Sequence, residues 1–244
     1  MPDSNTYVLV HGAWHGGWCW SRVADTLRQA GHHVHTPTLP GLGERRHELS
    51  ASIDLETFIQ DLCRMLIREG LHDIILVGHS FGGLVISGAA DRLPERIARL
   101  VYLDAFLLPP GTSTFDTLPP ELVTKLEHGA AATGGIAPPR PDSFGLTDQA
   151  DIDFVQARLT PQPIGSYREP LRLRHPLGNG LPITYVRCTQ PPFPAVAGSY
   201  TWARETFGEH WDWMDLATGH DAMISAPDAV TVMLTRLQGG QSAR

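Results

Sequence analysis

The chain has 244 residues, of which 42% are hydrophobic and 18% charged, and its formal net charge is −7. This length and composition fit one soluble α/β domain, residues 1–244. The lack of a basic cluster argues against nucleic acid as a partner, and no apolar run is long enough to span a bilayer. The polar N-terminus lacks the basic and apolar regions of a signal peptide, so the sequence predicts a cytoplasmic protein. The cysteines, Cys19, Cys63 and Cys188, have no C-x-x-C spacing, which argues against a disulfide framework or a structural zinc site.

Strand and helix patterns alternate along the chain, which is typical of a mostly parallel sheet flanked by helices. The expected strands are Tyr7–His11, His33–Pro37, Ile74–Val77, Arg99–Leu103, Ile183–Cys188 and Trp211–Leu216. A helical pattern follows Ile74–Val77 directly, and the other expected helices are Trp20–Ala30, Asp54–Glu69, Pro120–His128, Asp148–Arg158 and Pro227–Leu237. In the helix that begins near Asp54, apolar residues recur at three- and four-residue steps, and Asp54 is a plausible N-cap.

Residues 106–181 break this alternation, since prolines punctuate them and no strand pattern is present. A stretch this long between two strands is typical of a lid or binding loop, so we expect a cap inserted into the domain at 106–181. Its apolar side chains either line a pocket for a small apolar molecule or pack the cap onto the core. They are Phe115, Leu118, Leu122, Leu126, Phe144, Phe154 and Val155.

The most informative motif is Gly78-His79-Ser80-Phe81-Gly82, which follows a buried strand and precedes a helical pattern. In that setting Gly-x-Ser-x-Gly forms a sharp strand-to-helix turn, which exposes the serine hydroxyl and needs glycine on both sides to avoid clashes. The sequence therefore predicts that Ser80 is the nucleophile of an acyl transfer.

A serine nucleophile needs a base, an acid that orients the base, and donors for the oxyanion, in the chain order serine, acid, histidine. Of the 12 histidines, His220 fits best, because it lies in the loop between the last expected strand and the last expected helix. For the oxyanion we expect the backbone N–H of Phe81, just after the nucleophile. The second expected donor is the N–H of Ala13, in the glycine-rich loop after the first strand.

Three segments carry a family resemblance: 11–20 (His-Gly-Ala-Trp-His-Gly-Gly-Trp-Cys-Trp), 78–83 (Gly-His-Ser-Phe-Gly-Gly) and 219–223 (Gly-His-Asp-Ala-Met). Together they resemble the α/β-hydrolase superfamily. Within it, the chain is similar to the branch of plant methyl-salicylate-type esterases, hydroxynitrile lyases and their bacterial esterase relatives. The resemblance covers nearly the whole chain outside the expected cap. It implies an α/β-hydrolase fold with an eight-stranded core sheet and a helical cap, with neither a metal nor an organic cofactor.

The sequence departs from that branch at the acid of the serine–histidine–acid triad. In members of the branch this acid usually follows the second-last strand of the sheet. Residues 188–191 of this chain read Cys-Thr-Gln-Pro and contain no carboxylate. The lysine that hydroxynitrile lyases carry beside the acid is also missing, which argues against a cyanohydrin lyase.

We therefore expect Asp104 to be the acid. It ends the strand that follows the helix after the Ser80 turn, so it lies on the same edge of the sheet as Ser80. The alternative is an aspartate that only caps a turn. Asp221 should face away from the adjacent His220, and Asp212 and Asp215, on the last strand, are less favoured.

The leading functional hypothesis is a serine hydrolase. It would cleave a carboxylic ester, thioester or lactone of a small apolar or aromatic molecule through an acyl-enzyme on Ser80. An alternative keeps the fold but not the hydrolysis: a lyase, cyclase or other tailoring enzyme that uses His220 as a base. A third hypothesis, a binding protein with a vestigial triad, is disfavoured because a binder has no need of a strained serine.

Overall fold

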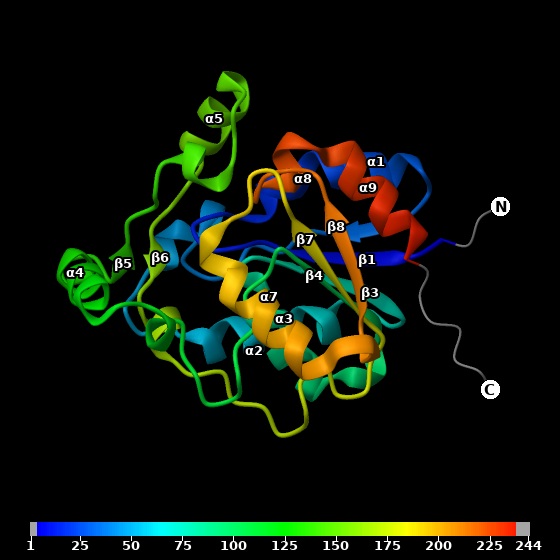
Figure 1. The fold of residues 1–244 in the computed structure, drawn as a ribbon, viewed down its shortest axis with the longest axis horizontal. Coiled ribbons are helices and arrows are strands. Elements are labelled where there is room, and N and C mark those ends of the chain that lie inside the picture. Colours follow the sequence, from blue (N-terminus) through cyan, green and yellow to red (C-terminus); the bar gives the residue numbers. More distant parts are fainter. Residues whose placement is uncertain (1–3, 238–244) are drawn as a thin grey trace.

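A parallel six-stranded sheet forms the centre of the computed structural model, which describes residues 4–237 (Figure 1). Its strand order is β2-β1-β3-β4-β7-β8, and each neighbouring pair is parallel. The strands are β1 (Thr6–Val10), β2 (His33–His35), β3 (Ile74–His79), β4 (Ile97–Leu103), β7 (Ile183–Cys188) and β8 (Asp212–Leu216).

All six strands that the sequence pattern predicts are present, and no end differs from its predicted position by more than two residues. The number of eight strands, which came from the family resemblance alone, is wrong for the central sheet of the described residues. The two remaining strands, β5 (Gly135–Ile136) and β6 (Gln162–Pro163), pair antiparallel in a separate ribbon. Both lie in the segment between β4 and β7, outside the run of strands that build the central sheet.

Alternating side chains of each central strand pack on opposite faces of the sheet, as a buried parallel sheet requires. On β1, Tyr7 and Leu9 face the cluster that contains α1 (Ser21–Gln29), α8 (Ala222–Ser225) and α9 (Pro227–Arg236). Val8 and Val10 face the cluster that contains α2 (Leu55–Arg68), α3 (Gly82–Arg92) and α7 (Pro194–Phe207). Figure 1 shows these two helical layers above and below the sheet.

Local sequence explains where the predicted helices begin. The carboxylate of Asp54 accepts a hydrogen bond from the Thr57 N–H at 2.7 Å and completes a capping box at the start of α2. Asp148 caps α5 (Gln149–Gln156) by accepting hydrogen bonds from the Ala150 and Asp151 N–H groups. The helix α7 was not predicted. Its buried side chains are few and small, namely Val196, Ser199 and Ala203, so it lacks a wide apolar stripe.

Residues 106–181 contain α4 (Pro120–Ala130), α5, α6 (Gly165–Arg168) and the β5–β6 ribbon. In Figure 1, α4, α5 and the ribbon lie to one side of the sheet, at the left, apart from the layer of α1 and α9. In the described part of the chain, no helix combines the length and apolar character that crossing a bilayer requires.

The carboxyl ends of the parallel strands meet at one edge of the sheet. Ser80 follows β3, Asp104 follows β4, His220 follows β8, and the loop that contains Ala13 follows β1. In an open α/β sheet, ligands bind outside this edge where the strand order reverses, here beside β1 and β3. The topology thus gathers all of the predicted site residues.

Candidate active site

The nucleophile elbow has the strained backbone that its sequence predicts. Ser80 has a φ of 52°, in the left-handed region that a residue with a Cβ rarely adopts. A Cβ at Gly78 would lie 2.8 Å from the Gly82 carbonyl oxygen, and one at Gly82 would lie 2.7 Å from the His11 carbonyl oxygen. Neither position can carry a side chain without moving backbone, so both glycines are needed to hold Ser80 in this turn.

Asp104 and His220 form a buried, hydrogen-bonded pair. Asp104 Oδ2 lies 2.6 Å from His220 Nδ1, and the two side chains are 1% and 2% exposed. The other carboxylate oxygen, Oδ1, accepts a hydrogen bond from the Cys188 N–H at 3.0 Å. Cys188, the last residue of β7, therefore helps to orient Asp104 through its backbone.

His220 is held by an aromatic ring that stacks on its own and by a hydrogen bond to its carbonyl. The ring of Phe193 stacks on it, with 4.0 Å between the centroids, and His79 Nε2–H donates to the His220 carbonyl at 3.0 Å. His79, His220 and Asp221 also place one possible metal-ligating atom each within 4.8 Å of one another. A metal there would displace existing partners, because Asp221 pairs with His15 and His220 pairs with Asp104.

The two expected oxyanion donors are free to bind a ligand. Among the described residues, neither the Ala13 N–H nor the Phe81 N–H has a hydrogen-bond acceptor. A Cβ at Gly12 would lie 2.7 Å from Ser80 Cβ and 3.3 Å from Ser80 Oγ, so the loop before Ala13 passes directly against the serine. Unpartnered N–H groups beside a nucleophile are the arrangement that stabilises a developing oxyanion.

The loop that carries Ala13 is fixed by a buried histidine. His11 Nε2 accepts from the Leu39 N–H at 3.0 Å, so its proton is on Nδ1, which donates to the Gly12 carbonyl at 2.8 Å. Burial lowers the pKa of His11 to about 3, which keeps the ring neutral. The Gly12 carbonyl and the Ala13 N–H belong to one peptide plane, so His11 orients the expected donor.

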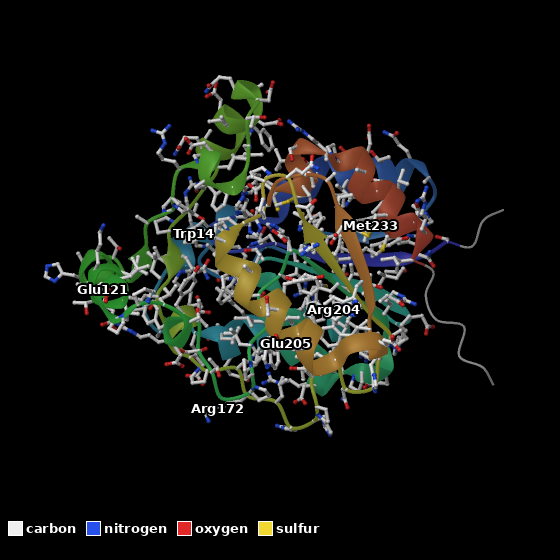
Figure 2. All side chains as sticks on the ribbon, viewed as in Figure 1. Trp14, Glu121, Arg172, Arg204, Glu205 and Met233 are labelled. Carbon is white, nitrogen blue, oxygen red and sulfur yellow. The ribbon has the colours of Figure 1, made fainter. Side chains whose placement is uncertain are left out.

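Trp14 connects this loop to the 106–181 segment. Its backbone N–H donates to Gln162 Oε1 at 3.0 Å, and its indole Nε1–H donates to the Ile136 carbonyl at 3.1 Å. Figure 2 shows Trp14 beside this segment. A change in the position of the segment would therefore act directly on the loop that carries Ala13.

Ser80 opens into an apolar cavity of about 280 Å³. None of the residues that line it carries a charge, and most come from the 106–181 segment. Leu118, Leu122 and Leu126 are among them, whereas Val155 packs instead in the core on the α1 and α9 side. The other lining residues are Trp14, Phe106, Thr114, Ile136, Ala137, Pro139, Tyr167, Phe193 and Ala195.

The structure places the expected residues after strands at one edge of the sheet: Ser80, Phe81, Asp104, His220 and Ala13. The residues that orient them were not predicted. His11 and His15 lie in the glycine-rich loop after β1, and the sequence of that loop does not indicate which distant residues they hydrogen-bond. Phe193 was missed because it precedes the unpredicted helix α7. Only the tertiary contacts of these residues show what they do.

The chain matches the alpha/beta hydrolase family over residues 7–232. It is 37% identical to a carbendazim hydrolyzing esterase from Nocardioides sp. (strain SG-4G), in a match that covers 95% of this chain and 98% of that protein. It is also 38% identical to methyl jasmonate esterase 1 from Vitis vinifera, but over only 41% of this chain and 39% of that protein.

Solved structures show the same architecture. An extracellular alpha/beta-hydrolase from a Paenibacillus species superimposes with a TM-score of 0.83 at 25% identity, covering 98% of this chain and 100% of that one. A methylesterase from Arabidopsis superimposes with a TM-score of 0.77 at 23% identity, covering 95% and 98% of the two chains. The elbow, the buried aspartate–histidine pair and these matches lead to one conclusion: the chain belongs to the α/β-hydrolase family.

Proposed function

We propose that this carboxylic ester hydrolase acts as a serine esterase, with Ser80 as nucleophile, His220 as base and Asp104 as the acid that orients the base. Ala13 and Phe81 supply the oxyanion donors. Residues 106–181 form a cap whose apolar side chains enclose the substrate beside Ser80. No metal or organic cofactor takes part in this proposal.

The reaction proceeds in two halves. Ser80 Oγ attacks the ester carbonyl carbon while His220 takes the hydroxyl proton, and the carbonyl oxygen becomes an oxyanion held by the two N–H groups. Collapse of this intermediate expels the alcohol, which takes the proton from His220 and leaves an acyl group on Ser80. Water then attacks the acyl-enzyme with His220 again as base, and the carboxylic acid is released.

The observation that carries the proposal is the hydrogen bond of 2.6 Å between Asp104 and His220. An aspartate there fixes the tautomer of the base and stabilises the imidazolium that forms in each half-reaction. The alternative of a non-hydrolytic lyase or cyclase drew its support from the missing acid after β7. Because Asp104 occupies that partner position, hydrolysis is the better supported reaction.

The cavity defines the substrate class as a neutral, largely apolar ester. Apolar lining favours a hydrocarbon or aromatic group, and an ionised group would lose its hydration without gaining a charged partner. The relatives named as esterases of carbendazim and methyl jasmonate support this substrate class without identifying the natural substrate.

Hydrolysis of p-nitrophenyl butyrate tests the proposal. We expect turnover by the wild-type protein and a loss of at least about 10³-fold in Ser80→Ala, because the acyl-enzyme cannot form. Ser87→Ala is the matched control. Ser87, on α3, is also buried, but it hydrogen-bonds the Gly83 carbonyl and the Tyr102 hydroxyl on β4 and does not line the cavity. Unchanged turnover in Ser80→Ala, or no turnover of any neutral ester by a folded wild-type protein, would overturn the proposal.

A further inference from the structure

His15 joins two loops that are 206 positions apart in the chain. Its Nδ1 lies 2.8 Å from the Ala13 carbonyl oxygen, and its Nε2 lies 3.2 Å from Asp221 Oδ2. The side chains of His15 and Asp221 are 2% and 0% exposed. One loop carries the proposed oxyanion donor, and the other carries His220, directly before Asp221.

The two partners of His15 determine its protonation state. A carbonyl oxygen and a carboxylate oxygen are both acceptors, and an imidazole ring supplies two N–H donors only when it is protonated. Both hydrogen bonds can therefore form together only if His15 is an imidazolium. Burial acts to lower the pKa of His15, but the negative charge and hydrogen bond of Asp221 outweigh it and raise that pKa.

The neighbouring titratable groups do not compete for this proton. His11 accepts a hydrogen bond on one ring nitrogen, and burial keeps it neutral. Burial and the nearby His220 likewise hold the pKa of His79 well below its usual value. Burial, followed by the charge of Asp221, raises the pKa of the Cys19 thiol, which keeps it protonated.

The pair acts on both halves of the catalytic machinery. His11 fixes the peptide plane before Ala13, through the Gly12 carbonyl, and His15 fixes the plane after it, through the Ala13 carbonyl. At the other end, Asp221 is the residue next to His220. The aromatic surroundings of His15 exclude water, since Trp18 stacks on it with 5.3 Å between the ring centroids.

We propose that His15 is a positioning residue of the esterase, which as an imidazolium paired with Asp221 locks the Ala13 loop to the His220 loop. The inference rests on the proposed function for its effect on turnover. A neutral His15 has one N–H, so deprotonation leaves either the Ala13 carbonyl or the Asp221 carboxylate without its hydrogen bond. The Ala13 N–H and His220 are then held less rigidly relative to each other, and kcat falls.

Nitrogen NMR of the histidine rings tests the protonation state directly, with no dependence on esterase activity. At pH 7.5 we expect the His15 ring, assigned by its loss in His15→Gln, to carry a proton on both nitrogens, whereas His11 and His79 carry one each. A neutral His15 ring at that pH would overturn the inference even if the protein is an active esterase.

Two variants then test the positioning role. In His15→Gln, kcat for p-nitrophenyl butyrate should fall by about 10²-fold with little change in KM, as expected for a misplacement of about 1 Å. Affinity for a trifluoromethyl ketone, which forms an oxyanion on Ser80, should fall in parallel. A purely structural role would instead lower the melting temperature and leave kcat unchanged at a temperature where the variant is folded.

Asp221→Asn is a second variant that tests the positioning role of His15, also in the case that His15→Gln does not fold. An asparagine amide can donate to His15 Nε2, so a neutral ring can make both hydrogen bonds, and the loss of kcat should stay within about tenfold. The fall of kcat at alkaline pH that His15 causes in the wild type should then disappear. An unchanged alkaline limb in Asp221→Asn would contradict the inference.

A second histidine–aspartate pair provides the matched control. His175 Nδ1 lies 3.1 Å from Asp91 Oδ1, and the side chain of His175 is 52% exposed, away from the catalytic groups. His175→Gln should therefore leave kcat, KM and the pH profile as in the wild type. If it reproduced the effect of His15→Gln, the loss would not be specific to the His15–Asp221 pair.

Discussion

The carboxylate of Asp104 lies 2.6 Å from His220 Nδ1, across 116 positions of sequence, and both side chains are almost completely buried. Asp104→Asn should lower kcat by about 10⁴-fold, because an asparagine stabilises the wrong tautomer of the histidine. Its effect on folding should be small, because the amide oxygen can still accept from the Cys188 N–H. Steady-state hydrolysis of p-nitrophenyl butyrate measures the loss.

Asp215 is the control for this substitution, as an aspartate on β8 that pairs with Arg187 at the surface. Because exposed ion pairs contribute little, Asp215→Asn should keep its activity within about twofold. Near-normal turnover in Asp104→Asn, or an equal loss in both variants, would remove Asp104 from the mechanism.

Gly12→Ala should strongly reduce kcat while leaving the protein folded. The added methyl group would lie 2.7 Å from Ser80 Cβ, which is anchored to the backbone, so the Ala13 loop must shift. A shift of about 1 Å at the reacting groups costs about 10²-fold in kcat. Gly129→Ala on α4 is the control, because its Cβ meets nothing within 4 Å and alanine favours the helix. Equal kcat values for the two variants would contradict the proposed oxyanion site.

Burial of neutral His11 should make the protein less stable in acid. Its pKa of about 3 when folded lies below the value of 6.5 expected when unfolded, so the unfolded state binds more protons between these values. This contribution to stability is present above pH 6.5 and is lost as the pH falls toward 3, by up to about 5 kcal/mol.

Urea unfolding of wild type and His11→Gln at pH 7 and pH 4 measures this contribution. The difference between the two pH values should be smaller in His11→Gln, since glutamine does not titrate. His128→Gln, at an exposed position of α4, should behave as the wild type. An identical pH dependence in wild type and His11→Gln would show that His11 is not the group responsible.

Charge on the substrate should sharply reduce turnover. Methyl valerate and monomethyl glutarate have similar lengths, but the second carries a carboxylate at pH 7. With no charged side chain lining the cavity, kcat/KM for the charged ester should be lower by more than about 10²-fold. Release of methanol measures both rates, and comparable values would contradict the proposed apolar binding mode.

Sequence alone predicted the framework of the site because its signals are local. The glycines around Ser80, the N-cap at Asp54 and the alternation of the strands are each enforced by the nearby backbone, and the parallel topology then gathers the strand ends. His15–Asp221 and the ring of Phe193 on His220 could not be predicted in this way. Both interactions join segments that are far apart in sequence, and hydrophobic periodicity does not indicate such contacts.

Reaction with a fluorophosphonate probe shows whether Ser80 is an activated nucleophile. Intact-mass and peptide analysis should show one phosphonyl group per chain, located on Ser80. Labelling should be slowed in Asp104→Asn and absent in Ser80→Ala. Failure of the folded wild-type protein to react, or labelling at another residue that persists in Ser80→Ala, would show that Ser80 is not the activated nucleophile.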